Sequence, residues 1–464
     1  MPPPAETLAA RLKDIAAEVA IIGPQALAER HPGEHPGNFG AGVMALPTST
    51  EMVAEIVRFC ASEMIGVVPQ GGRTGLVGGG ISTPGELIVS TEKMTEIELI
   101  DPATRIAIVQ AGVTLQALQE AAAPYGLTPG IDLAARGSAT IAGMVSTNAG
   151  GILAFRNGVM RHQVLGLEAV LPDGTVFSDL TEVVKVSAGP DMKQMFIGAE
   201  GALGIVTRIV LRLETLRTAR ATALVGVKDA ATALAVVGHF RSQPALMLEG
   251  AELMWAQFIR DSASVHGFDL GWLDEGTAAV LLFEVSAETA ELAAETLESG
   301  LETLWEELGL DGGIVARSLD QSRKFWELRE DSDFIYRLHP GAPSFDVSIP
   351  PGELDTYVVA LAARLRTIDP AWGAYVYGHI ADGNLHISVT GANELTDADK
   401  ERIEDAVYAG IRGLGGSFSA EHGAGLEKRR AYIAYGNAER RALAQALKRA
   451  IDPDNLFNRG KVPY

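Results

Sequence analysis

Glycine-rich segments that directly follow short β-branched runs are the feature that most restricts how this chain can fold. The first, VVPQGGRTGLVGGG at 67–80, has six glycines, and related segments occupy 130–132, 137–151 and 196–207. Because glycine has no Cβ, its backbone amide can approach a bound anion closely. Tight turns explain the first segment equally well, but the four together offer more close-approach positions than turns require. We therefore expect one extended ligand with a pyrophosphate to contact all of them.

A dinucleotide site of the Rossmann type is the first alternative for such a loop. That site needs G-x-G-x-x-G at the start of a helix. Here the loop continues through Ile81, Ser82 and Pro84 into the apolar run at 87–90. The sequence therefore argues against a Rossmann site in this segment.

The spacing of apolar residues predicts an α+β fold class. Runs with strand character occupy 66–69, 87–90, 105–112, 166–172, 204–213 and 278–286. Helical spacing or capping patterns predict helices at 5–20, after the capping box at 48–51, from Thr114, and at 287–308, 319–338, 353–366 and 396–414. Glycines become fewer and helices longer after about residue 215, so a second α+β domain should begin there.

Length and charge limit the classes of function. The chain has 464 residues, 47% of them hydrophobic, which is enough for roughly two to four globular domains. A formal net charge of −21 disfavours nucleic acid and anionic membranes as partners. No apolar run is long enough for a membrane span, and no signal peptide is recognisable, so we expect a cytoplasmic protein.

The single cysteine, Cys60, excludes an intramolecular disulfide and a cysteine-rich metal site. It shares a helical apolar stripe with Val53, Ile56 and Val57. We therefore expect a buried thiol without chemistry, in a reducing compartment.

Two histidines flank a turn in the segment at 374–389. Its two β-rich runs surround Asp382-Gly383 and predict a hairpin in which His379 lies opposite His386. Directly opposed residues point to the same face with Cβ atoms about 4.5–5.5 Å apart, so two imidazoles could share a metal ion. An ordinary pair of hydrogen-bonded histidines is the alternative.

A second group of polar residues lies in SAEHGAG at 419–425, where Glu421 and His422 are adjacent. In an extended loop, neighbouring side chains point to opposite sides. Glu421 could then complete a His/His/Glu metal site while His422 faces the substrate. Two imidazoles and a carboxylate suit Zn²⁺ or Mn²⁺ better than Ca²⁺.

In combination, the loops at 67–80, 137–151 and 196–207 resemble the FAD domain of the vanillyl-alcohol oxidase/p-cresol methylhydroxylase type, over roughly residues 38–215. The resemblance implies FAD contacts from Gly71, Gly72, Arg73, Thr74, Gly75, Leu76, Gly137, Ser138, Thr140, Gly143, Gly201, Gly204 and Ile205. Some members attach FAD covalently through a histidine in the first loop. The matching residues here, 72–75, include no histidine, so we expect noncovalent FAD. Relatives often have Asn-Thr-Gly where this chain has Ser187-Ala188-Gly189, which leaves the isoalloxazine-side hydrogen bonds open.

The segments GHIADGNLH, SAEHGAG and DPDNLFNRGK resemble the C-terminal region of the FAD-linked oxidases, similar to D-lactate and D-2-hydroxyglutarate dehydrogenases. This resemblance implies metal ligation by His379, His386 and Glu421, and His422 as catalytic base. It also implies that Asn458 and Lys461 close the flavin pocket. Two positions depart from the usual pattern: Ala381 replaces Gly, and Ser388 replaces Asn.

Arg329 lies in FWELREDSDF, which resembles a helix whose arginine engages the substrate carboxylate in the family. A solvated ion pair is the alternative interpretation. Relatives specific for 2-hydroxyglutarate commonly have Thr and Lys where this chain has Asp333 and Ser344. These replacements favour a substrate other than 2-hydroxyglutarate.

The resemblance thus implies a metal-assisted dehydrogenase that oxidises a D-2-hydroxy acid, D-lactate-like or D-2-hydroxyglutarate-like, with hydride transfer to flavin N5. The expected divisions are 1–37, an N-terminal helix and loop; 38–215, the FAD domain; 216–418, a ferredoxin-like substrate domain; and 419–464, a catalytic loop, a helix and a tail that returns to the flavin. Electrons would pass to an electron-transfer flavoprotein, a quinone or a cytochrome.

Two other function classes stay open, an FAD oxidase of a sugar or phenol that uses O₂ and a flavin- or metal-containing electron carrier. The oligomeric state is open as well, with a homodimer as one candidate.

Overall fold

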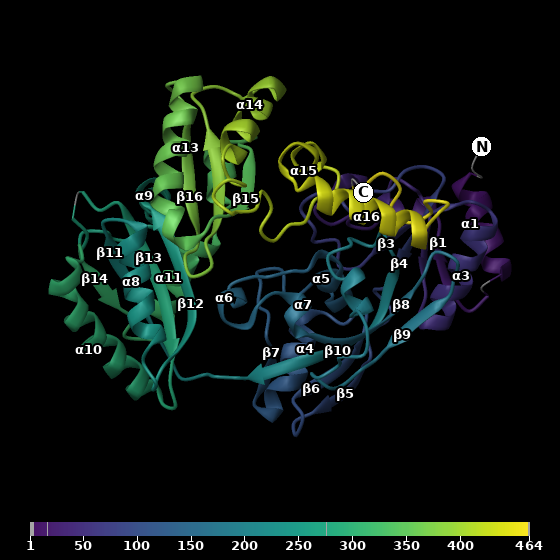
Figure 1. The fold of residues 1–464 in the computed structure, drawn as a ribbon, viewed down its shortest axis with the longest axis horizontal. Helices are drawn as coiled ribbons and strands as arrows, with labels where there is room; N and C mark the ends of the chain where they lie inside the picture. Colours follow the sequence, from purple (N-terminus) through teal and green to yellow (C-terminus); the bar gives the residue numbers. More distant parts are fainter. Residues whose placement is uncertain (1–3, 16, 275, 463–464) are drawn as a thin grey trace. The chain divides into compact units, whose positions relative to one another are not determined.

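The structure is a computed structural model that describes residues 4–15, 17–274 and 276–462 (Figure 1). The chain forms two compact units, and each is described by itself. Unit 1 contains the described residues of 1–216 and 421–464, and unit 2 is 217–420. Unit 2 is therefore one continuous stretch of chain, while unit 1 is built from two.

Unit 1 contains two sheets. The first has the order β1-β2-β4-β3, with β2, β4 and β3 parallel: β1 (Ala20–Ile22), β2 (Met44–Leu46), β3 (Gly66–Gln70), β4 (Glu86–Ser90). The second is antiparallel with the order β5-β6-β10-β8-β9, and β7 pairs with β10: β5 (Ile97–Asp101), β6 (Ile106–Gln110), β7 (Leu127–Pro129), β8 (Val164–Val170), β9 (Val176–Asp179), β10 (Ile205–Thr215). One hydrophobic core joins the two sheets.

The helices of unit 1 are short except at the two ends of the chain and at α3. They are α1 (Ala5–Ile15), α2 (Pro24–Ala28), α3 (Thr50–Ser62), α4 (Leu115–Ala122), α5 (Ile141–Thr147), α6 (Ala154–Asn157), α7 (Met160–Gln163), α15 (Arg429–Tyr435) and α16 (Ala438–Ile451), with 3-10 turns at Pro36–Phe39, Ala123–Tyr125 and Met192–Met195.

Helix α3 illustrates why its sequence folds as it does. The Ser49 side chain accepts a hydrogen bond from the Met52 backbone N–H at 3.3 Å, which satisfies one of the amides left open at a helix start. Val53, Ile56, Val57 and Cys60 are all buried in the core, as the apolar stripe predicts. The N-cap is Ser49 rather than the Thr48 expected from the capping-box pattern.

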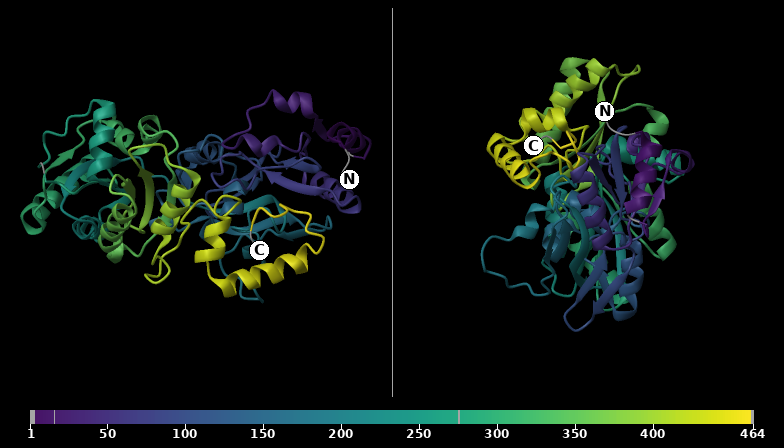
Figure 2. Two further views of the ribbon diagram at one scale, coloured as in Figure 1. Left: turned by 90° about the horizontal axis from the view of Figure 1, so that it is seen from above. Right: turned by 90° about the vertical axis from the view of Figure 1, so that its right-hand side faces the viewer.

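The C-terminal segment belongs to unit 1 (Figure 2). The Val67 N–H of β3 donates to the Leu456 carbonyl at 2.8 Å, and the Asn458 N–H donates to the Val67 carbonyl at 2.9 Å. The Lys448 ammonium on α16 is buried and donates to the Asp452 carboxylate and to the Ala202 and Phe457 carbonyls. The last residues described thus extend the sheet that carries the first glycine-rich loop.

Unit 2 has one antiparallel sheet with the order β14-β11-β13-β12-β16-β17-β15. Its strands are β11 (Arg220–Val227), β12 (Met247–Trp255), β13 (Ala279–Ser286), β14 (Gly313–Val315), β15 (Ser344–Ser348), β16 (Gly373–His379) and β17 (Asn384–Thr390). The helices are α8 (Ala230–Arg241), α9 (Ala256–His266), α10 (Ala290–Leu308), α11 (Leu319–Glu330), α12 (Phe334–Leu338), α13 (Leu354–Ile368) and α14 (Asp397–Tyr408), with a 3-10 turn at Pro351–Glu353.

Helices pack on both faces of this sheet, and the two faces alternate along each strand. On one face, α9, α11 and α12 pack on Leu224, Met254, Leu282 and Tyr377. On the other face, Phe240 of α8 packs against Phe283 of β13, with ring centroids 5.0 Å apart. The first face is the one that carries the candidate site, because Tyr377 and His379 point the same way along β16.

The α+β class is confirmed, and most predicted elements differ from the observed ones only at their ends. Three predicted helices end early or are divided in two. The first ends at Ile15, because Ala20–Ile22 pairs with β2 instead. The segment 319–338 is two helices separated at 331–333, and the helix predicted to end at 414 ends at Tyr408, shortly before Gly410 at φ +80°. In the part of the chain that the structure describes, no helix combines the length and the hydropathy that a membrane crossing needs.

Candidate functional site

A cavity of about 380 Å³ lies within unit 1, and the glycine-rich loops form most of its wall. The predicted FAD contacts that line it are Gly71, Gly72, Arg73, Thr74, Gly75, Leu76, Thr140, Gly143, Gly201, Gly204, Ile205 and Asn458. Glu421 and His422 also line it. Loops that are far apart in the sequence therefore meet around one cavity.

Gly137 and Ser138 are not among the residues that line this cavity. Ser138 instead explains why residue 72 is a glycine. A Cβ at Gly72 would lie 1.8 Å from the Ser138 carbonyl oxygen, and a Cβ at Gly71 would lie 2.3 Å from the Thr140 hydroxyl. At Gly75 a Cβ would meet no atom within 4 Å. The first two glycines thus serve packing between loops as well as any approach to a ligand.

The Arg73 guanidinium shares the carboxylate of Glu92 with a second arginine. It donates to the Glu92 carboxylate at 3.1 Å and lies over the Phe39 ring, 5.4 Å from the ring centroid. Glu92 also accepts from Arg30 at 2.6 Å. One carboxylate shared by two guanidinium groups leaves a net positive charge on this cluster, so the Arg73 side chain as well as the backbone of the loop could contact a pyrophosphate.

Glu200 is a half-buried acidic residue in the cavity wall that the sequence analysis did not single out. Its carboxylate accepts the backbone N–H groups of Ala424 and Gly425 at 2.8 and 2.9 Å. Burial raises the pKa of the Glu200 carboxyl group, while these hydrogen bonds and the nearby Lys428 lower it. A lone acidic residue among small residues, in FIGAEGALG, was the available signal.

In unit 2 the predicted hairpin is present, but its register differs from the prediction. His379 pairs with Asn384, and His386 pairs with Tyr377, so the two histidines are not directly opposite. The turn has four residues, 380–383, because the Gly383 N–H donates to the His379 carbonyl. Positions 377 and 379 have the same parity, so both histidines still point to one face, with ring centroids 5.4 Å apart and planes at 83°.

Glu252 on β12 orients His379. Its carboxylate oxygen Oε1 lies 2.5 Å from His379 Nδ1, and Oε2 accepts from Arg329 Nε at 2.6 Å. Glu252 is buried, and this desolvation by itself raises the pKa of its carboxyl group. The positive charge of Arg329 and the contact with His379 outweigh the desolvation and hold the pKa at about 2. A carboxylate on Nδ1 leaves Nε2 as the nitrogen of His379 that could bind a metal ion. The sequence analysis missed Glu252, although an acidic residue in the apolar strand MLEGAELMW was a signal.

Arg329 is buried and lies over the Tyr377 ring, 4.7 Å from the ring centroid. It is therefore not the solvated residue of the alternative interpretation. Its Nε is occupied by Glu252, so a substrate carboxylate could use only the terminal guanidinium nitrogens.

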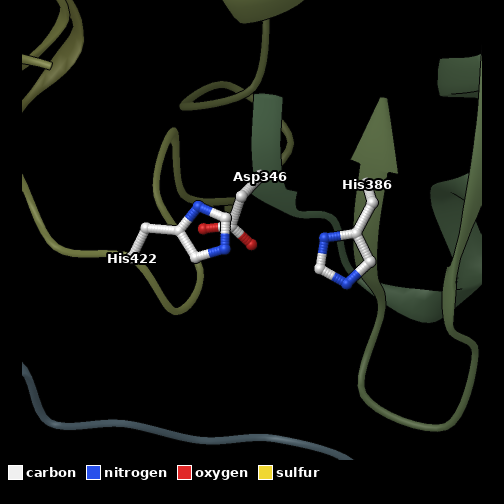
Figure 3. Close-up of side chains that lie close together, drawn as sticks. All are labelled: Asp346, His386 and His422. Carbon is white, nitrogen blue, oxygen red and sulfur yellow. The ribbon is translucent and has the colours of Figure 1, made fainter. Parts of the chain in front are cut away.

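Asp346 is a second acidic residue that the sequence analysis missed. It lies on β15 directly opposite His386 of β17, and Figure 3 shows both side chains, together with His422 on its loop. Asp346 is fully buried and accepts from Asn384 Nδ2 at 2.9 Å and from the Ala420 N–H at 3.0 Å. The chain then continues directly into Glu421 and His422.

Glu421 and His422 belong to unit 1, where the Gly151 N–H donates to Glu421 Oε1 at 2.5 Å. The predicted metal ligands thus come from two units, with His379 and His386 in unit 2. Lys461 does not line the cavity; it is buried and pairs with Glu86 at 3.3 Å.

Comparisons with known proteins match two parts of the chain to families of FAD enzymes. The family described as FAD linked oxidases, C-terminal domain, matches residues 216–462, and the FAD binding domain matches 41–179. A D-2-hydroxyglutarate dehydrogenase of Xanthomonas citri pv. viticola is 33% identical over 424 residues, which is 90% of this chain and 88% of that protein. The chain belongs to the FAD-linked oxidase family.

A second relative supports the membership, and a solved structure shares the fold. The mitochondrial D-2-hydroxyglutarate dehydrogenase of Arabidopsis thaliana is 33% identical over 431 residues, 90% of this chain and 74% of that protein. The crystal structure of p-cresol methylhydroxylase with substrate bound has a TM-score of 0.72 at 16% identity and covers 99% of this chain and 96% of that one. This second likeness concerns the fold alone. As a member of the family, the chain is an FAD-dependent oxidoreductase.

The cavity of unit 1 fits the cofactor of this family. Its volume is in the range usual for ligand pockets, about 300–1,000 Å³. Two buried atoms of residues in its wall, Gln70 Oε1 and Asn458 Oδ1, have no hydrogen-bond partner among the described residues. Buried polar atoms rarely stay unpaired, so these two indicate a polar ligand.

The histidine face of unit 2 has the same property. Asn384 Oδ1 and Ser388 Oγ are buried without a hydrogen-bond partner in the described part of the chain. Both residues share a face with His386, because positions 384, 386 and 388 are two apart along β17. This face is therefore suited to a polar substrate or a metal ion.

Proposed function

We propose that the protein oxidises a D-2-hydroxy acid to the 2-oxo acid, with FAD and a divalent metal ion, and passes the electrons to a separate acceptor. The observation that carries this proposal is the position of Ala420. Its N–H is bound by Asp346, opposite His386, and the next two residues, Glu421 and His422, line the cofactor cavity. Consecutive Cα atoms are about 3.8 Å apart, so the residue directly before Glu421 in the chain is fixed to the sheet that carries the two histidines.

For the metal we propose His379 Nε2, His386 and Glu421 as ligands, and Zn²⁺ or Mn²⁺ as the ion. The Glu252–His379 hydrogen bond supports this, since metal-binding histidines usually donate their other nitrogen to a carboxylate. Glu421 keeps one carboxylate oxygen, Oε1, on the Gly151 N–H. Two imidazoles and a carboxylate are typical ligands for these ions.

For the cofactor we propose that the loop at 71–76 surrounds the pyrophosphate of a noncovalent FAD. The proposed contacts elsewhere are Thr140, Gly143, Gly201, Gly204, Ile205 and Asn458. Gly137 and Ser138 would act through the packing of the loop rather than by contact, because they lie outside the cavity wall.

In this proposal the chain's own residues bind and deprotonate the substrate. His422 would accept the proton of the 2-hydroxyl group, and Arg329 would orient an anionic group of the substrate through its terminal nitrogens. When bound, the ion supplies a Lewis acid for the hydroxyl group, and FAD supplies the acceptor for the hydride from C2. General-base catalysis of this kind contributes roughly 10²–10⁴-fold, so His422→Ala should slow flavin reduction by that factor while FAD stays bound.

Two kinds of side chain on the 2-hydroxy acid are considered, one with a second carboxylate and one without. The relatives are named D-2-hydroxyglutarate dehydrogenases, which supports a dicarboxylate. Asp333 at the start of α12 and Ser344 at the start of β15 support a smaller acid, because neither can pair with a second carboxylate as a cation would.

Anaerobic flavin reduction tests the whole proposal. The holoenzyme is mixed with D-lactate, D-malate, D-2-hydroxyglutarate and their L-enantiomers, and flavin absorbance is followed. We expect one of the D-acids to bleach the flavin. The rate constant of this reduction should be at least as large as the turnover number measured with an artificial dye as electron acceptor. Bleaching only by a sugar or phenol, with peroxide formed in air, would establish the FAD oxidase instead. A flavin that none of these compounds reduces would support an electron carrier.

An electron-transfer flavoprotein, a quinone or a cytochrome would serve as acceptor, and a cytoplasmic location would suit the single buried thiol. Reduction of each acceptor by the substrate-reduced enzyme, together with cell fractionation, tests these two points.

A further inference from the structure

The loop at 417–425, here called the linking loop, carries Glu421 and His422 and contains the peptide bond that joins unit 2 to the C-terminal part of unit 1. Loop backbones need hydrogen-bond partners when they are withdrawn from water. In the linking loop two carboxylates, the buried Asp346 and the half-buried Glu200, supply partners on either side of the Glu421–His422 pair.

On the unit 2 side the partner is Asp346. Its Oδ2 accepts the Ala420 N–H at 3.0 Å, and its Oδ1 accepts the Asn384 side chain at 2.9 Å. Ser348 and Ser417 also exchange backbone hydrogen bonds of 2.9 and 2.8 Å. Asp346 lies within the sheet and is fully buried, so the start of the loop has the rigidity of β15.

On the unit 1 side the partner is Glu200. Its two carboxylate oxygens accept the N–H groups of Ala424 and Gly425 at 2.8 and 2.9 Å, one oxygen for each donor. The backbone of Glu200 has φ +50°, a conformation that non-glycine residues rarely adopt. The Glu200 carbonyl accepts Asn458 Nδ2 at 2.5 Å, so the residue also contacts the C-terminal wall of the cavity.

We propose that Asp346 and Glu200 are positioning residues of the linking loop, Asp346 for Glu421 as a metal ligand and Glu200 for His422 at the cofactor. This inference rests on the proposed function. Charge-assisted hydrogen bonds from backbone amides to a carboxylate are strong and directional. Each carboxylate contacts the backbone one to three residues from the side chain that it positions, so its loss should displace that side chain first.

Glu200→Gln tests the cofactor side. Glutamine has the shape of glutamate, but its amide nitrogen is a donor and would oppose one of the two loop N–H groups. A displacement of about 1 Å can lower a rate about 10²-fold, so we expect flavin reduction to slow by up to this factor with FAD content unchanged. Glu200→Asp keeps the charge but is shorter, and its rate should fall between those of the parent and of Glu200→Gln.

A double-mutant cycle shows whether Glu200 acts through His422. His422→Ala should lower the reduction rate by roughly 10²–10⁴-fold. If Glu200 only positions His422, adding Glu200→Gln to His422→Ala should change the rate by less than about twofold. Multiplying effects in the double variant would overturn the positioning role.

Asp346→Asn tests the metal side with a readout that does not depend on turnover. The probe is Zn²⁺, and its dissociation constant is measured by competition with a chromophoric chelator. Outer-shell partners of metal ligands typically affect affinity about 10–100-fold, and we expect an increase of this size in the Zn²⁺ dissociation constant. The increase should disappear when Glu421→Gln is already present. An increase of the same size in that background would overturn the assignment.

Two other buried carboxylates provide matched controls. Glu168 in unit 1 accepts the Thr50 hydroxyl at 2.6 Å, and Glu284 in unit 2 accepts the Thr222 hydroxyl at 2.9 Å. Glu168→Gln and Glu284→Gln should lower thermal stability but leave the reduction rate and the Zn²⁺ dissociation constant unchanged. If Asp346→Asn and Glu200→Gln behave like these controls, the inference is wrong. If His422→Ala alone reduces flavin at the parental rate, the proposed base is wrong, while the Zn²⁺ cycle still decides the role of Asp346.

Discussion

The Cys60 side chain is fully buried, which keeps its thiol away from solvent and reagents. It lies on α3 in the core of unit 1 with none of its surface exposed, and burial raises the pKa of its thiol to about 12. Since the thiolate is the reactive form, a buried thiol of this kind is inert in the folded chain. The expectation of a core thiol without chemistry is confirmed at the level of burial.

The first prediction concerns this thiol. A disulfide reagent such as dithionitrobenzoate should not modify the folded protein at pH 8 within the time that unfolded protein needs to react fully. In the unfolded chain the thiol returns to a pKa near 9, so ionisation favours unfolding, and folding stability should fall as pH rises above about 9. Chemical denaturation at pH 8 and pH 10 measures the trend, with Cys60→Ala as control. Rapid labelling of the native protein would contradict the burial.

At the residue scale, the histidines and glycines could be found from the sequence, whereas their supporting carboxylates could not. His379, His386 and His422 occur in recognisable motifs. Glu252, Asp346 and Glu200 lie in apolar or small-residue segments, where an acidic residue is unusual but gives no partner. The partner of each is far away in the sequence, as Arg329 is for Glu252, and only the folded chain brings them together.

At the scale of elements, periodicity predicts which face the histidines of the β16–β17 hairpin share, but it does not predict the register of the two strands. The shared face of the two histidines follows from strand parity. The register does not, because the position of the turn depends on a third segment. A Cβ at Gly383, whose φ is +78°, would lie 1.8 Å from the Ile349 carbonyl, and the Ile349 N–H donates to the Gly383 carbonyl. This contact after β15 places the turn at 380–383.

The first glycine-rich loop gives a prediction for two neighbouring glycines. Gly72→Ala should lower the melting temperature of the apoprotein, because its Cβ would clash with the Ser138 carbonyl. Gly75→Ala should leave the melting temperature of the apoprotein unchanged, because its Cβ meets no atom within 4 Å. If Gly75 contacts FAD, the added methyl group should meet the cofactor, and Gly75→Ala should bind FAD more weakly than the parent. Equal melting temperatures for the two apoproteins would contradict the packing role of Gly72.

The same loop predicts how FAD is attached. Residues 72–75 contain no histidine that could form a bond to the flavin. Acid precipitation should therefore release all the flavin into the supernatant, in an amount equal to the flavin content of the native enzyme. Yellow colour that remains with the precipitated chain would show a covalent bond and would direct attention to His422, which also lines the cavity.

At the scale of the whole molecule, the proposed metal site uses side chains from both units, whereas the proposed FAD site uses unit 1 alone. The two ligands should therefore be separable. Treatment with a chelator should abolish flavin reduction by the substrate but leave the flavin bound, and Zn²⁺ or Mn²⁺ should restore the reduction.

Elemental analysis checks this prediction directly. We expect about one ion per chain in the parent and none in the double variant His379→Ala/His386→Ala. The parallel variant His339→Ala, which changes a histidine of unit 2 outside the proposed ligand set, should keep its ion. A fully occupied double variant would remove these two histidines from the metal site.

The division of unit 1 into two chain segments has a consequence for synthesis on the ribosome. Strand β3 pairs at Val67 with residues around Phe457, which are translated long after β3 itself. Unit 2 is continuous in sequence and can fold while the chain is still growing. The edge of β3 in unit 1 stays open until the segment around Phe457 has left the exit tunnel. During this interval the nascent chain exposes a strand edge and a glycine-rich loop, so premature termination near residue 420 should produce a chain that needs chaperones and aggregates, even though every residue of the first sheet has been made.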